Sequence, residues 1–345
     1  MDRAIRLCGW VVAAGAALAT LAGCTHGPAA RAGSGSDTSA GASSGAATGE
    51  TSGATGATSG TDSGATSGAN SGTSGASKGA MNQDAAVTGS GCGKPAAPTG
   101  DFHLHTTDGN GVARDYEVMV PTTYDPNTPL ALAFLYHGAG GTEASAVAFG
   151  LQRAPGAASS AIFVFPQGIP YQTYGVGWDD RCAGYDMVFF DKMLSELTAS
   201  YCIDPKRVFA GGFSWGCDHT TALACCRGSR LRAVAAASCS DDFANAADYK
   251  TYINEPCPAS GTTGIRFTFD PQGDPAYTAQ NFKMTSALYE SLNSCLATSA
   301  ATAVTPCVSF QGCSKPLVEC PYPGLGHGLP ANWATDTWSF FSTFK

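Results

Sequence analysis

The sequence is poor in charged residues and contains no cluster of basic ones. Only 13% of its 345 residues are charged. Residues 91–345 carry 15 basic and 22 acidic side chains, a net charge of −7. Because such a surface repels the phosphate backbone, the sequence predicts no nucleic-acid partner.

The sequence also lacks a C-x-x-C pair, although it contains 14 cysteines. Zinc sites built from closely spaced cysteines are therefore disfavoured, and we predict no metal. Apart from Cys8 and Cys24 near the N-terminus, 12 cysteines remain. An even number in an exported chain indicates mostly disulfides, whose pairing the sequence leaves open. The adjacent Cys225 and Cys226 are expected to have different partners.

No apolar run near the N-terminus is long enough to cross a membrane and remain there. Arg3 and Arg6 precede an apolar run at residues 7–21, which is the layout of a secretory signal. The segment ending at Cys24 resembles the bacterial lipobox, in which the cysteine is acylated. We expect residues 1–23 to be a lipoprotein signal peptide and Cys24 to be lipidated; an ordinary signal cut nearby is the alternative. We therefore expect an exported protein whose lipid anchors it at the cell envelope or outer surface. Secretion without an anchor is the alternative.

Large apolar side chains are nearly missing from residues 24–90, which are mostly Ser, Gly, Ala and Thr. Such a segment cannot bury enough apolar surface to fold, so we predict a flexible tether, whose glycosylation stays open. Residues 91–345 can hold one sizeable core and predict a single α/β domain. The oligomeric state is not indicated by the sequence.

The most informative motif is Gly212-Phe213-Ser214-Trp215-Gly216, a G-x-S-x-G pattern. An apolar segment at residues 208–210 precedes it, and a helix-compatible run at residues 220–226 follows it. In this context the serine lies on a strained strand-to-helix turn, where flanking glycines avoid collisions. We predict that Ser214 is a nucleophile, against the alternative of a chance match.

Strand and helix patterns alternate around this motif. They predict an α/β fold with a mostly parallel central sheet and helices on both faces. Buried strands are predicted at Leu130–Tyr136, Ala161–Pro166, residues 208–210, residues 233–238, Gly264–Phe269 and residues 317–320. Helices are predicted at residues 186–201, 220–226, 277–296 and 333–344.

A β-hairpin is predicted across residues 108–111, with strands at 102–105 and 114–120. His103 and His105 would share one face of its first strand and could bind a metal. Because no third ligand is evident, surface histidines are the favoured interpretation.

The predicted strand Gly264–Phe269 is followed by two carboxylates, Asp270 and Asp274. A carboxylate after a late strand is the acid that orients the histidine of a serine nucleophile. Either aspartate qualifies, and either could instead stabilise a turn. His327 lies in a glycine-rich loop after the last predicted strand and completes the order Ser, Asp, His. We predict that it is the base; a loop histidine without function is the alternative.

A glycine-rich loop also follows directly after the strand Leu130–Tyr136, beginning at His137. Flexible backbone at that place can present an N–H to a developing oxyanion. We predict that the amides of Ala139 and Trp215 are the two donors; a plain glycine turn is the alternative.

With these motifs in place, the chain resembles the α/β-hydrolase family of polyhydroxybutyrate depolymerase-like esterases, which includes feruloyl and acetylxylan esterases. The resemblance covers residues 92–345, and its specific pieces are residues 92–95, 134–141, 163–168, 177–178, 186–191, 201–216 and 322–327. The acid segment is shorter than in the family; aligning its last aspartate favours Asp274, while Asp270 stays open. Cys217 replaces a common glycine and is expected to form a local disulfide.

The resemblance implies a serine carboxylesterase that hydrolyses feruloyl or acetyl esters of plant cell-wall polysaccharide through an acyl-enzyme, without a cofactor. A polyester depolymerase and a non-catalytic surface-binding protein are the alternatives. We expect substrate contacts from His137, Trp178 and Tyr277. They belong to a wider set of candidates, about half of which should be core residues, that also includes Tyr171, Tyr174, Trp215 and Trp333.

Overall fold

The computed structural model describes residues 90–345, except residues 96, 240, 242, 245–256 and 259–262. The predicted signal peptide, Cys24 and the predicted tether up to residue 89 lie outside the described residues. In the part of the chain that is described, no helix combines the length and the apolar character that a membrane span requires.

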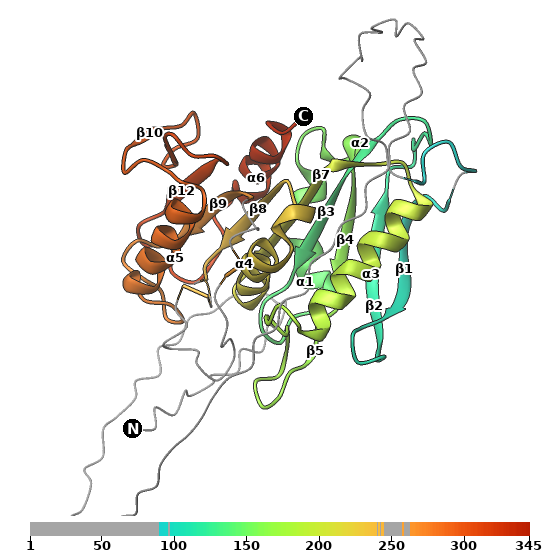
Figure 1. Cartoon of the computed structure of the whole chain (residues 1–345), viewed down its shortest axis with the longest axis horizontal. Coiled ribbons are helices and arrows are strands. Elements are labelled where there is room, and N and C mark those ends of the chain that lie inside the picture. The colour runs from blue at the N-terminus through green and yellow to red at the C-terminus, as the bar shows by residue number, and fades with distance from the viewer. Residues whose placement is uncertain (1–89, 96, 240, 242, 245–256, 259–262) are drawn as a thin grey trace, which may run out of the picture. The chain divides into compact units, whose positions relative to one another are not determined.

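A ten-stranded sheet organises these residues (Figure 1), in the order β1-β2-β4-β3-β7-β8-β9-β12-β11-β10. The neighbours from β4 to β12 pair in parallel, whereas β1 and β2 at one edge and β11 and β10 at the other are antiparallel. The strands are β1 Gly100–Thr107, β2 Ala113–Val120, β3 Leu130–Tyr136, β4 Ala161–Pro166, β7 Ile203–Phe213, β8 Ala233–Ala237, β9 Gly264–Phe269, β10 Ser299–Ala301, β11 Val308–Phe310 and β12 Leu317–Pro321. A separate two-stranded ribbon pairs β5 Ile169–Pro170 with β6 Val176–Gly177.

Helices cover both faces of this sheet (Figure 1), which confirms the predicted α/β-hydrolase architecture. One face carries α3 Tyr185–Ser200, α4 Trp215–Arg227 and α5 Ala279–Leu292. The other face carries α1 Glu143–Ala148, α2 Ala157–Ser160 and α6 Trp333–Ser342. Two short 3-10 turns, η1 Leu151–Arg153 and η2 Gly228–Arg230, complete the described elements.

The central strands β3, β4 and β8 are continuous apolar runs because both of their faces are buried. Every residue of β3 is buried, and its side chains alternate between two cores. Phe134 and Tyr136 pack on the side of α3, whereas Ala133 and Leu135 pack on the side of α6. This double burial holds the ends of the strands in place for the loops that follow them.

Most predicted elements are confirmed, with shifted ends. The strands β3, β4 and β9 have the predicted bounds, and α4 begins at Trp215 rather than at residue 220. The predicted helix over residues 277–296 is shorter, because Thr278 caps it and Ser294 has a positive φ of 54°. The short strands β10 and β11 were not predicted, because they contain no buried apolar run.

The predicted hairpin of β1 and β2 is confirmed. His103 and His105 lie on its exposed face, and His105 contacts Asp115 on β2. No group of three potential ligands that could hold a metal ion is found among the residues with defined positions.

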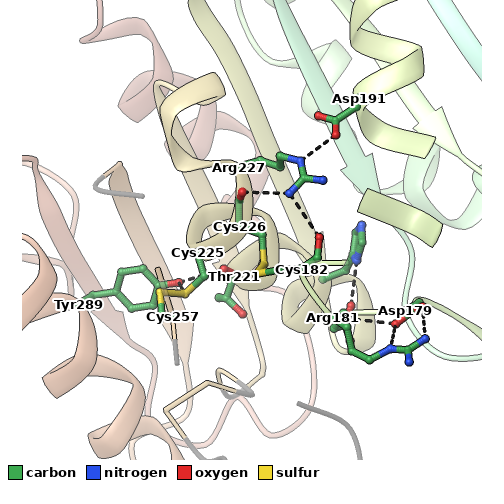
Figure 2. Close-up of a disulfide and its surroundings, with 12 residues drawn as sticks. Asp179, Arg181, Cys182, Asp191, Thr221, Cys225, Cys226, Arg227, Cys257 and Tyr289 are labelled. Atoms are coloured by element: carbon green, nitrogen blue, oxygen red, sulfur yellow. Dashed lines mark hydrogen bonds and ion pairs between the residues drawn. A yellow bond between two sulfur atoms is a disulfide. The ribbon is translucent and has the colours of Figure 1, made fainter. Parts of the chain in front are cut away.

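All twelve cysteines from Cys92 onward form disulfides, as the even count predicted. The pairs are Cys92–Cys202, Cys182–Cys226, Cys217–Cys239, Cys225–Cys257, Cys295–Cys313 and Cys307–Cys320. Cys225 and Cys226 do have different partners, and Figure 2 shows both bonds. Cys217 bonds a cysteine 22 residues away, which ties the first turn of α4 to the chain after β8.

Candidate active site

Ser214 occupies the turn between β7 and α4 in a strained backbone conformation, with φ 56° and ψ −129°. The turn is sharp because the chain packs against itself on both sides of the serine. A Cβ on Gly212 would lie 2.0 Å from the carbonyl oxygen of Gly216, and a Cβ on Gly216 would lie 2.1 Å from that of Tyr136. Only glycine fits at either position. The two glycines therefore allow the strained backbone of Ser214, and the packing of the surrounding strands maintains it.

Three predicted residues meet at this turn. The Nε2 atom of His327 lies 2.9 Å from the Oγ atom of Ser214. Its other ring nitrogen, Nδ1, lies 3.0 Å from the Oδ2 atom of Asp274. This arrangement fits an imidazole that donates from Nδ1 to the carboxylate and accepts the serine hydroxyl at Nε2.

The carboxylate of Asp274 is held by the backbone as well as by His327. Its Oδ1 atom accepts the amides of Ala276 and Tyr277 at 2.7 and 2.8 Å. Burial raises the pKa of Asp274, but the hydrogen bond from His327 and the two amides outweigh it and hold the pKa below its ordinary value. The group is therefore ionised at neutral pH, as an orienting acid must be.

Asp270, the other candidate acid, does not contact the imidazole. It accepts the amide of Gln272 at 3.0 Å and the amide of Gly326 at 2.9 Å. These backbone hydrogen bonds lower the pKa of Asp270. The carboxylate thus anchors the loop that carries His327, while Asp274 alone of the two reaches the ring.

The glycine-rich loop after β3 lies directly beside Ser214. A Cβ on Gly138 would be 3.0 Å from the Cβ of Ser214, and the amide of Gly140 donates to the carbonyl of Val176 at 2.8 Å. Neither the amide of Ala139 nor that of Trp215 donates a hydrogen bond to a residue with a defined position. Both amides stay available at the two sides of the nucleophile.

His137 and Trp178 lie beneath this loop, with 0% and 1% of their surface exposed. The ring of His137 accepts the amide of Gly168 at Nε2 and contacts the carbonyl of Gly138 through Nδ1. Trp178 donates from Nε1 to the carbonyl of His137 at 2.9 Å. Burial lowers the pKa of His137, so the ring is neutral. Because neither side chain reaches the surface, both support the loop from below rather than touch a substrate, contrary to the expectation.

A buried pair that sequence reasoning did not single out supports Trp215. Asp180 accepts the indole N–H of Trp215 at 3.0 Å and lies 2.8 Å from the Nδ1 atom of His219. Burial raises the pKa of Asp180 well above its ordinary value, and burial lowers the pKa of His219 to about 4. Both shifts favour uncharged groups, so the pair holds Trp215 without a buried net charge. In the sequence, this pair could have been noticed from the two adjacent acidic residues Asp179-Asp180, which directly follow Gly177-Trp178.

Tyr277 links the acid segment to the helix of the nucleophile. Its hydroxyl donates to the carboxylate of Asp218, in the first turn of α4, at 2.7 Å. Its ring lies 5.9 Å from that of His327, and 9% of the residue is exposed. Tyr277 therefore fixes the distance between α4 and Asp274 and offers little surface to a substrate.

Of the candidate aromatic residues, only Tyr174 and Trp215 present substantial surface to solvent. Tyr174 is 40% exposed and Trp215 is half-buried, with their ring centroids 6.4 Å apart in an edge-to-face contact. Tyr171 packs behind them, 6.1 Å from Trp215. The remaining candidates are buried: Trp178, Tyr277 and Trp333.

The geometry agrees with the relatives of the chain. It is 31% identical over 272 residues to a probable feruloyl esterase C of Aspergillus clavatus, which covers 74% of this chain and 91% of that protein. It is also 31% identical over 269 residues to feruloyl esterase C of Emericella nidulans, covering 73% of this chain and 90% of that protein. The chain belongs to the feruloyl esterase family of α/β-hydrolases.

The solved structures support the fold of this esterase. An acetyl xylan esterase from Aspergillus awamori superposes with a TM-score of 0.51 at 17% identity, covering 70% of this chain and 99% of that protein. The chain matches no protein-family model. As a family member, the chain is a carboxylic ester hydrolase, which confirms the class that the motifs predicted.

Proposed function

We propose that this esterase hydrolyses feruloyl or acetyl esters of plant cell-wall polysaccharide, with Ser214, His327 and Asp274 as its catalytic triad. The observation that carries the proposal is the chain of contacts from Ser214 Oγ through His327 to Asp274, at 2.9 and 3.0 Å. The names of its relatives supply the ester class.

In the proposed reaction, His327 Nε2 takes the proton of Ser214 as Oγ attacks the ester carbonyl carbon. The resulting imidazolium is stabilised by the ionised Asp274, which also fixes the tautomer through Nδ1. His327 then returns the proton to the leaving alcohol oxygen, and the C–O bond of the ester breaks. Water repeats the sequence on the acyl-enzyme and releases the acid and the free serine. This sequence needs no metal and no organic cofactor.

The negative charge of the tetrahedral intermediate falls on the former carbonyl oxygen. The amides of Trp215 and Ala139 are the proposed donors to this oxygen, at the start of α4 and in the loop after β3. Preorganised donors of this kind contribute about 3 kcal/mol each to transition-state stabilisation. The positive end of α4 points in the same direction.

The acyl or sugar group of the substrate is proposed to rest against Trp215 and Tyr174. Trp215 directly follows Ser214 and is half-buried, Tyr174 is exposed and packs against it, and flat aromatic surfaces stack well on an aromatic acid or on a sugar face. The buried His137, Trp178 and Tyr277 act from behind this surface.

We also propose that the protein is exported and that Cys24 carries a lipid, so that membrane contact occurs only through that lipid. Six disulfides support an oxidising compartment outside the cytoplasm. Metabolic labelling with a fatty acid tests the anchor. Incorporation that persists in Cys24→Ala would rule it out.

The substrate proposal is tested with the full chain, produced under oxidising conditions. Its kcat/KM is compared on methyl ferulate, p-nitrophenyl acetate and short hydroxybutyrate oligomers, with Ser214→Ala and His327→Ala as controls. We expect turnover that depends on both residues and favours the ferulate or acetate ester by at least about tenfold, or 1.4 kcal/mol. A preference for the oligomers would assign polyester breakdown instead. Equal turnover by Ser214→Ala would exclude the proposed nucleophile.

A further inference from the structure

A pocket, which we call the basic pocket, opens at the opposite end of the sheet from Ser214. It has a volume of about 320 Å³ and is lined by Pro205, Lys206, Gly228, Ser229, Arg230, Leu231, Arg232 and Lys315. Lys206 lies near the amino end of β7, whereas Ser214 follows the carboxyl end of the same strand. Arg232 directly precedes β8, and Lys315 precedes β12. The basic pocket is therefore separate from the active site.

Four cations gather in this pocket from three segments that lie far apart in the sequence. None of the four, Lys206, Arg230, Arg232 and Lys315, forms an ion pair with a carboxylate of defined position. By contrast, Arg181 and Arg227 do pair with aspartates (Figure 2). In a domain with a net charge of −7, four cationic side chains that line one pocket without acidic partners of defined position need a separate explanation.

Two of these cations are held in place. The guanidinium of Arg232 lies 5.1 Å from the centre of the Phe344 ring, and its Nε atom is buried without a hydrogen-bond partner. Lys315 follows a segment fixed by the Cys295–Cys313 disulfide and by the amide of Ser314, which donates to the carbonyl of Asn293 at 2.7 Å. The guanidinium of Arg232 and the backbone that carries Lys315 are therefore held at the pocket.

Close acidic side chains do not neutralise the pocket. Asp204 is the nearest carboxylate in the sequence, and its Oδ1 atom accepts the backbone amide of Lys206 at 2.9 Å. No ion pair to the side chain of Lys206 accompanies this bond. The side chains of Lys206 and Arg230 are exposed and can meet an anion from solvent.

We propose that the basic pocket binds the carboxylate groups of an acidic polysaccharide, that is, a chain that contains uronate sugars. Guanidinium groups bind carboxylates in a bidentate manner, and a recess accepts a projecting sugar acid better than it accepts a flat membrane surface. The choice of a polysaccharide over other polyanions rests on the proposed function. Binding at the far end of the sheet would hold the polymer near the enzyme while leaving Ser214 open to its ester groups.

The test measures the affinity of the full chain for polygalacturonate and for a neutral xylan, in a Ser214→Ala background so that no ester is cleaved. We expect binding to polygalacturonate only, and we expect this binding to weaken as salt is added. Lys206→Gln combined with Arg230→Gln should weaken it about tenfold, since each exposed charge contact contributes modestly. Arg153→Gln combined with Lys283→Gln removes the same charge elsewhere and should leave the affinity unchanged.

Arg232→Gln, checked for an unchanged unfolding transition, should also weaken the affinity for polygalacturonate. This variant tests the pocket independently of Lys206 and Arg230. Equal affinity for the neutral xylan, or equal weakening by the control pair, would overturn the proposal. Retention on phosphatidylglycerol vesicles that the Lys206/Arg230 variant loses, without binding to polygalacturonate, would assign the pocket to a phosphate surface instead. If wild-type enzyme cleaved no ester but bound polygalacturonate as expected, the proposed function would fail and the basic pocket would stand.

Discussion

At the scale of single residues, what a carboxylate contacts decides what it does. Asp270 and Asp274 lie four positions apart after the same strand, and both have a lowered pKa. Asp274 reaches the imidazole of His327, while Asp270 accepts backbone amides that hold the loop around it. The sequence left these two roles open because chain order is the same for both.

The two roles predict different losses of activity. Asp274→Asn should lower kcat by about 10⁴-fold, because an amide cannot hold the imidazole in the required tautomer. Asp270→Asn should lower kcat by only about tenfold, because the loop shifts but the imidazole keeps its partner. The measurement is kcat on p-nitrophenyl acetate, with thermal unfolding as the control. Comparable losses in both variants would contradict the assignment of the acid.

The lowered pKa of Asp274 also predicts a pH dependence of stability. An aspartate in the unfolded chain has a pKa of about 3.9, so below that value the unfolded state binds this proton more readily than the folded state. The stability from the ionised carboxylate is therefore complete above about pH 4 and is lost as the pH falls through the lowered folded pKa. The difference in unfolding free energy between wild type and Asp274→Asn should stay constant above pH 5 and narrow below pH 4. A difference that persists unchanged to the lowest pH at which the protein folds would refute this.

At the scale of elements, α4 is the part on which the site depends. Its first turn supplies the amide of Trp215, the carboxylate of Asp218 and the disulfide of Cys217. The run of helix-compatible residues was recognised only from residue 220, because several residues of this first turn serve the site. This run therefore missed the start of the helix, although the G-x-S-x-G motif marked the turn that leads into it.

The tight packing of this turn predicts an unusual cost for a small substitution. Inside a helix, alanine is favoured over glycine by about 1 kcal/mol. A Cβ at Gly216 would nevertheless lie 2.1 Å from a backbone oxygen, which cannot move aside cheaply. Gly216→Ala should therefore lose about 2 kcal/mol of unfolding free energy overall, since overpacking costs about 1–3 kcal/mol.

Gly328 provides a matched control for this prediction, because it is next to His327 and yet has room for a methyl group. The nearest atom to a Cβ there is 3.8 Å away. Gly328→Ala should leave the free energy of unfolding within about 0.5 kcal/mol of the wild-type value. If chemical denaturation found the two variants equally stable, crowding at the turn of Ser214 would not explain its glycines.

At the scale of the whole molecule, disulfides connect segments that the sheet alone leaves far apart in the chain. Cys92–Cys202 spans 110 residues, whereas Cys307–Cys320 spans 13. Closing a longer loop removes more conformational entropy from the unfolded chain. The long bond joins the start of the described domain to the residue before β7, the strand that carries the nucleophile.

This difference in loop length predicts an order of stabilities. Replacing Cys92 and Cys202 by alanine should lower the unfolding free energy by about 5 kcal/mol, and replacing Cys307 and Cys320 should lower it by about 3 kcal/mol. Denaturant unfolding of the two double variants, with wild type alongside, measures both losses. A larger loss for the shorter loop would show that packing around Cys307 outweighs chain entropy.

The sequence by itself determined the type of fold and the order of the site. Uninterrupted apolar runs predicted the bounds of β3 and β4, because strands buried on both faces have little choice of residue. The bounds of β9 were also predicted, although this strand contains Arg266 and Thr268. Likewise, the G-x-S-x-G turn, the late aspartates and His327 were recognisable because their chemistry demands those residue types. The short strands β10 and β11 carry no such signal.

Only the tertiary structure decided which groups actually meet. It brought Asp274 rather than Asp270 to the ring of His327, paired the cysteines, and buried His137 and Trp178, from which substrate contacts were expected. It also gathered Lys206, Arg230, Arg232 and Lys315 into one pocket, although the sequence contains no basic cluster. The physical reason is the same throughout. In a parallel sheet, residues far apart in the chain are brought together at the strand ends, and a local sequence pattern does not indicate which distant segments will meet there.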